Sequence, residues 1–365
     1  MLKVLNVLNS MDLQQGGPPE VIRNLKKSLN KDKNIISVLP LSRVTNKMII
    51  QFLFSRKARS RFCKFLNNYD IIHSHTIWSG KIALLAYFAN TLGVKVIFSS
   101  HGYLDDYSMS QSVLKKKLFY ALILKRLILR ANLFFSNMGE YKDSKLRISF
   151  ADKFVIPNGI NSSIYKKNLK KKNSLKKKII YFGRIHEKKG IEILLNAIKE
   201  LPEKYFERYV FEITGPGETE YRNKVNKMIN DLKISKYVSM LPPKKGEEKI
   251  KYLLDADVFV LPSFEEGDSI ALKEAMSAYN AVIISEQCRL ELVKEKKAGF
   301  IIKTEKNSLK NALIELDNND LEIMGNNSKK IIEEYFDNDH CSNRVLKIYE
   351  DIHTGSFISK DWISN

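Results

Sequence analysis

Short apolar runs alternate with helical patterns along the whole chain. The apolar runs predict two sets of about six strands, at residues 3–8, 35–39, 71–73, 94–99, 133–136 and 153–156 and at residues 178–182, 209–214, 238–241, 258–261, 282–285 and 299–302. The stretches between them carry apolar residues at helical spacing, as in Ile191, Leu194, Leu195 and Ile198. Strands that alternate with helices are typical of βαβ units and parallel sheets. The pattern therefore predicts an α/β fold with two doubly wound parallel-sheet domains.

A lysine-rich segment separates the two sets of strands. Residues 166–178 hold eight lysines and no acidic residue, so this segment cannot bury an apolar face and is predicted to be an exposed linker. The predicted domains are residues 1–165 and 179–342, and a chain of 365 residues is long enough for two separate cores. A helical pattern runs from residue 343 to about residue 352, within a C-terminal segment of residues 343–365.

The charge is unevenly distributed between the halves. The net charge is +20. Residues 1–165 carry 25 basic and 9 acidic side chains, whereas residues 179–365 carry 28 basic and 32 acidic side chains. A basic first half favours an anionic partner, either nucleic acid or an anionic membrane surface. Residues 46–65 and 111–130 are both basic and strongly apolar, which favours the membrane surface. A codon bias towards Lys, Asn and Ile is the alternative explanation, although it would affect both halves alike.

Other features bear on the compartment. The longest apolar run, residues 118–124, is much shorter than the roughly 20 residues that span a bilayer. The first eight residues lack the basic and long apolar regions of a signal peptide. Cys63, Cys288 and Cys341 are widely spaced and odd in number, which fits a reducing compartment. We expect a cytoplasmic protein, bound peripherally at the inner face of the cytoplasmic membrane; its oligomeric state stays open.

Two carboxylates, Glu266 and Glu274, flank a glycine turn between a predicted strand and a predicted helix. Glu266 is expected on the loop and Glu274 one to two turns into the helix, so both lie near a helix N-terminus, which attracts phosphate. Carboxylates can accept hydrogen bonds from sugar hydroxyls. The loop is therefore a candidate site for a phosphate and the sugars beside it, with a solvated helix start as the simpler alternative.

Further candidates also follow predicted strands, which is where parallel sheets bind ligands. Arg184 and Lys189 flank the start of a predicted helix, and a planar guanidinium together with an ammonium group suits a diphosphate. Glycines let the backbone approach a phosphate closely. They stand at the ends of three of the predicted strands, as Gly16 and Gly17, Gly183, and Gly215.

Histidines follow two strands of the first half. His101 stands at the end of the fourth strand, close to Tyr103 and Asp105, and is placed for contact with a ligand. His73 and His75 occupy a similar position at the third strand. A His-x-His pair is compatible with a metal, but no third ligand of suitable spacing is nearby, so we predict no metal site and assign these residues to structure or substrate lining.

These motifs occur together in one order along residues 1–350. That order is Gly16-Gly17, His101-Gly102, 157-Pro-Asn-Gly-Ile-160, Gly183-Arg184, 214-Thr-Gly-Pro-Gly-Glu-218, and Pro262-Ser263 followed by Glu266-Gly267 and Ala275-Met276. In this order the chain resembles the family 4 retaining glycosyltransferases of the GT-B fold. The resemblance implies two Rossmann-like domains that face each other across a cleft, and a C-terminal helix that crosses back to the first domain.

The resemblance also implies an activity. It implies an enzyme that transfers a hexose-like sugar from a nucleotide sugar to a glycan or polyprenyl-linked acceptor, with the first domain binding the acceptor. A bacterial surface polysaccharide pathway, such as O-antigen (lipopolysaccharide) or capsule assembly, is the implied setting. Such enzymes need no metal for phosphate departure, because positive side chains and helix dipoles stabilise the leaving diphosphate. No cofactor is expected, since the nucleotide sugar is a substrate.

Roles for individual residues follow from the resemblance. Arg184 and Lys189 would bind the donor diphosphate, Glu274 would accept from the ribose, Glu266 would lie at the donor sugar, and His101 would line the reaction centre. Four of these five residues, Arg184, Lys189, Glu266 and His101, form the implied catalytic set. The full donor set is Gly16, Gly17, Gly183, Arg184, Lys189, Gly215, Glu266, Gly267, Asp268, Ser269, Ile270 and Glu274. The acceptor set is His73, His75, Tyr103 and Asp105.

The chain departs from the family pattern at two places. The usual Glu-Gly-Phe-Gly-Leu is here Glu266-Gly-Asp268-Ser-Ile270, and Asp268 beside a phosphate would repel it unless the carboxylate faces a sugar hydroxyl. We therefore expect Asp268 to be a sugar-selectivity residue. The second departure is residues 278–281, where the family often has a glycine; Asn280 is expected to adopt the left-handed conformation instead.

Three other functions remain open at this point. A GT-B-like sugar-nucleotide epimerase would convert a nucleotide sugar without an acceptor. A non-catalytic partner subunit would keep the fold and bind acceptor lipid but no donor. A nucleic-acid-binding protein would explain the basic half, but the sequence contains no RRM, KH, helix-turn-helix or zinc motif, so we expect no nucleic-acid partner.

Overall fold

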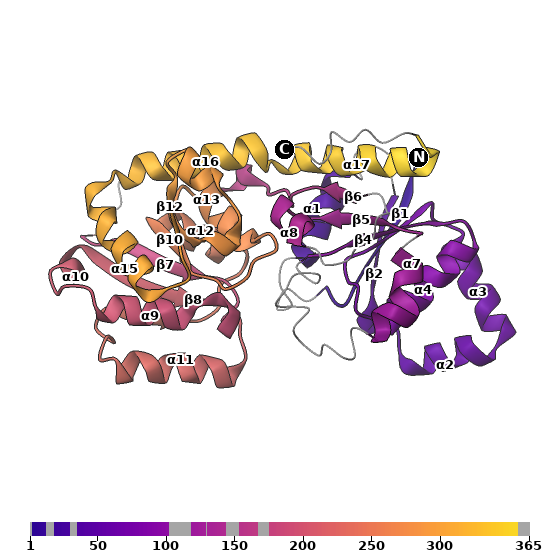
Figure 1. The fold of residues 1–365 in the computed structure, drawn as a ribbon, viewed down its shortest axis with the longest axis horizontal. Coiled ribbons are helices and arrows are strands. Elements are labelled where there is room, and N and C mark those ends of the chain that lie inside the picture. Colours follow the sequence, from indigo (N-terminus) through magenta and orange to yellow (C-terminus); the bar gives the residue numbers. More distant parts are fainter. Residues whose placement is uncertain are drawn as a thin grey trace. The chain divides into compact units, whose positions relative to one another are not determined.

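The structure is a computed structural model that describes residues 2–11, 18–29, 35–101, 118–128, 130–143, 153–166 and 175–356. The chain divides into two compact units (Figure 1). Unit 1 consists of Met1–Gly159 together with Asn338–Asn365, and unit 2 of Ile160–Asp337. The boundary between Gly159 and Ile160 lies before the predicted linker. Ile160 and Tyr165 belong to unit 2 because they form hydrogen bonds with its residues.

Unit 1 is built on a six-stranded parallel sheet in the order β2-β1-β3-β4-β5-β6. Its strands are β1 (Lys3–Leu8), β2 (Ile35–Pro40), β3 (Ile71–Ser74), β4 (Lys95–Ser99), β5 (Asn132–Phe135) and β6 (Lys153–Val155). Its described helical segments are α1 (Pro18–Leu29), η3 (Leu41–Arg43), α2 (Asn46–Phe54), α3 (Arg56–Leu66), α4 (Gly80–Thr91), the π-helical turn η4 (Tyr120–Leu124), α7 (Lys125–Ile128), α8 (Met138–Asp143) and α17 (Asn338–Thr354).

Helices cover both faces of this sheet. One face, which includes Leu5 and Ile72, packs with α4 and α7, and the other, which includes Val4 and Ile71, packs with α1 and α17. Strands buried on both faces are apolar at nearly every position, which is why the sequence predicted them as continuous runs. Helix α17 lies along α1, and the Ser28 hydroxyl of α1 donates to Asp339 of α17 at 2.6 Å (Figure 1).

Unit 2 repeats the design with the strand order β12-β11-β10-β7-β8-β9, again all parallel. Its strands are β7 (Lys177–Phe182), β8 (Tyr209–Thr214), β9 (Val238–Leu241), β10 (Val258–Leu261), β11 (Ala281–Ser285) and β12 (Gly299–Ile302). Its described helical segments are η5 (Ser162–Ile164), η6 (Glu187–Lys189), α9 (Ile191–Lys199), α10 (Tyr205–Arg208), α11 (Thr219–Asp231), α12 (Gly246–Asp255), α13 (Ile270–Ser277), η7 (Glu286–Cys288), α14 (Leu292–Glu295), α15 (Lys306–Glu315), η8 (Leu316–Asn318) and α16 (Leu321–Tyr335).

The fold prediction of two doubly wound parallel-sheet domains is confirmed, and every predicted strand is present. Two boundaries differ from the prediction. The last helix begins at Asn338 rather than near residue 343, and β7 begins at Lys177, inside the segment predicted to be a linker. Residues 167–174 of that segment and residues 357–365 at the C-terminus lie outside the described part of the chain.

Candidate functional site

Two loops of unit 2 meet at the carboxyl edge of its sheet. Residues 183–190 connect β7 to α9, and residues 262–269 connect β10 to α13; β7 and β10 are neighbours in the sheet. The amide of Phe264 and the hydroxyl of Ser263 both donate to the carbonyl of Lys188, at 2.8 and 2.9 Å. Hydrogen bonds to the Lys188 carbonyl therefore hold the two loops together, independently of any ion pair between them.

Two consecutive ion pairs reinforce this junction. Lys189 Nζ lies 2.6 Å from Glu266 Oε1, and Lys188 Nζ lies 2.7 Å from Glu265 Oε2. Glu266 is buried, with its side chain only 6% exposed, so its charge depends on Lys189 for compensation. The structure thus brings together two of the predicted catalytic residues, which are 77 positions apart in the sequence.

Glycines allow the close approach of these loops. Gly190 has a left-handed backbone (φ +68°), and a Cβ there would lie 2.0 Å from the carbonyl oxygen of Pro262. Gly215, after β8, has a φ of +150°, and a Cβ there would lie 1.7 Å from the carbonyl oxygen of Gly183. Gly215, which was predicted, and Gly190, which was not, therefore both serve packing between the loops, and neither position has room for a larger residue.

Arg184 differs from its neighbours in this junction. Its side chain is exposed, and within the described residues its guanidinium has no hydrogen bond or ion pair. The backbone beneath it is fixed, because the Tyr181 hydroxyl donates to the Arg184 carbonyl at 2.7 Å. A guanidinium on a fixed backbone at the carboxyl edge of a parallel sheet is available for an anion.

Helix α13 begins the second part of the site. Ser269 caps it by accepting a hydrogen bond from the Leu272 amide, and Ile270 is its first residue. Glu274 is buried on this helix; it is paired with Lys249 of α12 and accepts a hydrogen bond from Tyr165 at 3.2 Å. Lys249 and Tyr165 were not among the predicted site residues, because nothing in their local sequence indicates a partner on α13.

The two departures from the family pattern can be located. Asp268 forms an ion pair with buried Lys273, whose Nζ lies 2.6 Å from Oδ1 and 4.2 Å from the ring centroid of Phe336. Because Lys273 neutralises it, Asp268 does not bring an uncompensated charge to the loop; its role in sugar selectivity stays a prediction. The expectation for Asn280 was wrong: Tyr279 is the left-handed residue (φ +63°), while the Asn280 amide donates to the carbonyls of Leu253 and Ala278.

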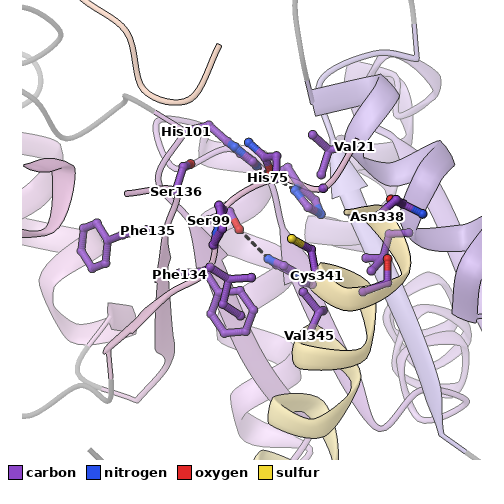
Figure 2. A pocket seen from close by; sticks show the side chains of 17 residues that line it. Val21, His75, Ser99, His101, Phe134, Phe135, Ser136, Asn338, Cys341 and Val345 are labelled. Atoms are coloured by element: carbon purple, nitrogen blue, oxygen red, sulfur yellow. Dashed lines mark hydrogen bonds between the residues drawn. The ribbon is translucent and has the colours of Figure 1, made fainter. Parts of the chain in front are cut away.

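In unit 1 the three predicted histidines form one cluster at the carboxyl edge of β3 and β4. His75 Nδ1 lies 2.9 Å from His101 Nε2, and the rings of His73 and His75 are stacked at 4.3 Å between centroids. Together they line a pocket between this edge, α1 and α17 (Figure 2). Figure 2 shows His75 and His101 side by side, with Val21 of α1 nearby.

His73 and His75 are buried, and both ring nitrogens of each are used. His73 Nδ1 and Nε2 contact Tyr349 and Ser99 at 2.6 and 2.7 Å, and His75 Nε2 contacts Asn6 Oδ1 at 2.8 Å. Burial, together with the neighbouring His101, lowers the pKa of His73 to about 3. Burial, and then the nearby His73 and His101, hold the pKa of His75 well below its usual range. Both rings are therefore neutral at pH 7.

These contacts distinguish the predicted histidines from one another. His73 is committed to structural hydrogen bonds, whereas His101 is only partly buried and lines the pocket. Gly16, Gly17, Tyr103 and Asp105 lie outside the described residues. Asn6 was missed by the sequence analysis, although a single polar residue in the middle of an apolar strand could have drawn attention to it.

Two general properties concern the described part of the chain. Across those residues no group of three or more His, Cys, Asp or Glu side chains is arranged to hold a metal ion. Nor is any of the described helices both long and apolar enough to cross a bilayer.

Comparisons with known proteins show the family of this chain. Residues 16–163 match the family described as Glycosyltransferase Family 4, and residues 164–334 match Glycosyl transferases group 1. The chain is 30% identical over 314 residues to UDP-Gal:alpha-D-GlcNAc-diphosphoundecaprenol alpha-1,3-galactosyltransferase of Escherichia coli, covering 78% of this chain and 76% of the relative. The chain belongs to the family 4 glycosyltransferases. It is thus an enzyme that transfers a sugar, as the motif order predicted.

Two further comparisons extend over nearly the whole glycosyltransferase. It is 25% identical to an uncharacterized 41.2 kDa protein in the cps region of Klebsiella pneumoniae, covering 96% of this chain and 99% of that one. The crystal structure of Anabaena HepE in complex with UDP and glucose has a TM-score of 0.75 to it, at 15% identity, covering 96% of this chain and 100% of HepE. The glycosyltransferase therefore has the GT-B fold.

Proposed function

We propose that this enzyme is a retaining glycosyltransferase that moves a sugar from a UDP-sugar to a lipid-linked glycan in bacterial surface polysaccharide synthesis. The name of the E. coli relative contains a UDP-sugar donor and a diphosphoundecaprenol-linked acceptor, and the Klebsiella relative is encoded in a cps region. The observation that carries the proposal is the junction of unit 2, which holds Lys189 and Arg184 at the edge where parallel sheets bind phosphate.

In this proposal unit 2 binds the donor. The diphosphate contacts Arg184, Lys189 and the backbone at Gly183 and Gly215, and the N-terminus of α13 adds the positive end of its helix dipole. Glu274 accepts hydrogen bonds from the ribose, and its ion pair with Lys249 holds the carboxylate in place on α13.

Lys189 gains a second partner when the donor arrives. Without the donor its ammonium group compensates Glu266, and with the donor it is shared with the diphosphate. Glu266 is then able to accept a hydrogen bond from a hydroxyl of the donor sugar. The site is thus organised in advance, so little ordering is needed at the moment of binding.

The reaction exchanges one bond at the anomeric carbon. The bond from that carbon to the phosphate oxygen breaks, and a bond to the acceptor hydroxyl oxygen forms on the same face, which retains the configuration. The proton of the acceptor hydroxyl passes to the leaving phosphate. Arg184 and Lys189 stabilise the charge that grows on the diphosphate, which is the task a metal ion performs in other transferases. His101 lines the acceptor side.

The donor assignment is tested by thermal shift. We expect one nucleotide class among UDP-, GDP-, ADP- and TDP-sugars to raise the melting temperature by several degrees at 100 times its Kd, equivalent to about 2.7 kcal/mol. The variant Glu274→Gln should lose this shift, because an amide cannot replace both acceptor oxygens at the ribose. Glu200→Gln, at an exposed pair with Lys306 and Lys310, is the matched control and should keep it.

Three results would count against the proposal. No shift with any nucleotide sugar would favour a non-catalytic partner subunit. A shift followed by conversion of the nucleotide sugar without acceptor would favour an epimerase. A mobility shift with oligonucleotides alone would favour a nucleic-acid-binding protein.

The same proposal places the enzyme on the cytoplasmic membrane surface, where a lipid-linked acceptor is found. Helices α2 and α3 carry six basic and no acidic residues between positions 46 and 66. They also expose large apolar side chains, with Phe54 85%, Ile50 57% and Met48 52% exposed. Basic residues near an anionic surface contribute about 1 kcal/mol each, and inserted apolar side chains add to this.

We expect the enzyme to co-sediment with phosphatidylglycerol vesicles and much less with phosphatidylcholine vesicles. The double variant Ile50→Ser/Phe54→Ser should bind at least about tenfold more weakly, because each buried apolar side chain contributes roughly 1.5–3 kcal/mol. Ile323→Ser, at a 58% exposed residue of α16 in unit 2, is the control and should bind as the wild type does. Equal binding of both variants would mean that α2 does not contact the membrane.

A further inference from the structure

Asn6 is an unusual residue for its position. It lies in β1, which pairs with β2 on one side and β3 on the other, and it is fully buried. Its Oδ1 contacts His75 Nε2 at 2.8 Å, but its Nδ2 has no hydrogen-bond partner within the described residues. A buried amide with one end unsatisfied lowers stability relative to an apolar residue of similar shape. Stability therefore does not explain why an asparagine stands here.

The contact between Asn6 and His75 determines where the ring proton of His75 lies. A carboxamide oxygen only accepts hydrogen bonds, so Nε2 of His75 must carry the proton. Burial holds the pKa of His75 well below its usual range, and the neutral ring has a single N–H. Nδ1 of His75 is therefore an unprotonated acceptor.

The next contact then has one possible direction. His101 Nε2 lies 2.9 Å from His75 Nδ1, and because Nδ1 can only accept, Nε2 of His101 must donate. The ring plane is set as well, because the rings of His75 and His101 are stacked at 5.2 Å with 20° between their planes. Nε2 of His101 is thus held as a donor, and its ring in one orientation, by a chain that begins at Asn6.

The backbone at His101 also indicates a constrained position. Its φ of +41° lies in the left-handed region, which costs energy for a residue with a side chain. Such strain is found where the surrounding structure holds a residue for function. Here it keeps the histidine at the end of β4, beside His75 and in the pocket lining (Figure 2).

We propose that Asn6 and His75 are positioning residues that hold His101 in the tautomer with its proton on Nε2, and that they thereby orient its ring in the pocket lining. No proton moves along the chain during the reaction; the chain selects a tautomer. The proposal rests on the proposed function for the placement of His101 at the substrates. The tautomer itself can be measured without any substrate.

The first test is nuclear magnetic resonance of enzyme labelled with ¹⁵N in its six histidines. The His101 signals, identified by their loss in His101→Gln, should show a protonated Nε2 and an unprotonated Nδ1. In Asn6→Leu the acceptor is gone, and His101 should shift towards a mixture of tautomers. Tyr349→Phe removes the 2.6 Å contact to the equally buried His73, and it should leave the His101 signals unchanged.

The second test separates positioning from folding. Asn6→Leu should lower kcat by about 10- to 100-fold, by analogy with removal of the partner that orients a metal-bound histidine, with an unchanged Kd for the donor nucleotide. His75→Gln keeps one donor and one acceptor group and should restore much of the kcat that His75→Leu loses. If Asn6→Leu does not fold, the comparison of His75→Gln with His75→Leu still tests the positioning role.

A protonated Nδ1 on His101 in the wild type would overturn the proposal, as would an unchanged tautomer and kcat in both Asn6→Leu and His75→Leu. The expected tautomer and its loss in Asn6→Leu, found in an enzyme that transfers sugar from none of the donors, would uphold the positioning chain and reject the proposed function instead.

Discussion

Replacing Lys189 by methionine should reduce kcat/KM by about 100- to 1,000-fold, the effect of removing one preorganised group that stabilises developing charge. The diphosphate gains charge as it leaves, so most of the loss should appear in kcat. The variant should also be less stable, because Glu266 remains buried without its partner, which costs about 3–5 kcal/mol when a buried pair is broken. Steady-state kinetics and urea unfolding measure the two effects separately.

The neighbouring pair supplies the matched control. Lys188→Met breaks the contact with Glu265, whose side chain is 11% exposed, and should lower stability comparably while affecting kcat/KM far less. The double variant Lys189→Met/Glu266→Gln should recover stability without recovering activity. If Lys188→Met and Lys189→Met lose equal activity, the effect comes from the junction of the loops and not from the diphosphate.

Lowering the pH from 7.5 to 5 should destabilise unit 1 strongly through its buried histidines. The native pKa of His73 is about 3, whereas the ordinary histidine value is 6.5. Below pH 6.5 the unfolded chain therefore binds a proton that the native state does not accept, and the free energy of unfolding falls as the pH falls towards 3. At pH 5 this amounts to about 2 kcal/mol for His73. His75, whose pKa is also lowered by burial and by its histidine neighbours, adds a loss in the same direction.

Urea unfolding at several pH values measures this loss. In His73→Gln the part due to His73 should disappear, so the variant should lose about 2 kcal/mol less than the wild type between pH 7.5 and pH 5. His340→Gln is the control, because His340 is one of the two histidines on α17 and lies outside the buried cluster. A pH dependence unaffected by His73→Gln would mean that His73 accepts its proton in the native state.

The strands were predictable because of how parallel sheets are buried. Both faces of each sheet are covered by helices, so runs such as residues 209–214 and 258–261 are mostly apolar and end where the strand ends. Helix starts were less certain. Helix α17 begins with Asn338 and Asp339, two polar residues that are typical of loops. Here their side chains form hydrogen bonds with Ser28 of α1, a contact that the sequence does not show.

The site was predictable as a set of positions but not as a set of contacts. The carboxyl ends of parallel strands share one edge, which is why the candidates after β7 and β10 could be expected close together. Their pairing could not be expected, because Lys189 has two neighbouring carboxylates, Glu265 and Glu266, and only the path of the loop decides which one it meets. The ion pair of Asp268 with Lys273 was missed for the same reason.

By itself, then, the sequence determined the α/β class, the strand positions and the family, because these depend on local apolar patterns and on motifs read along the chain. The tertiary structure decided which charges neutralise one another and where protons lie. Lys189 and Glu266 are 77 residues apart, and Asn6 is 69 residues from His75. Contacts over such separations depend on strand order and loop path, and a hydrogen bond or an ion pair changes with a shift of an ångström, which no local pattern specifies.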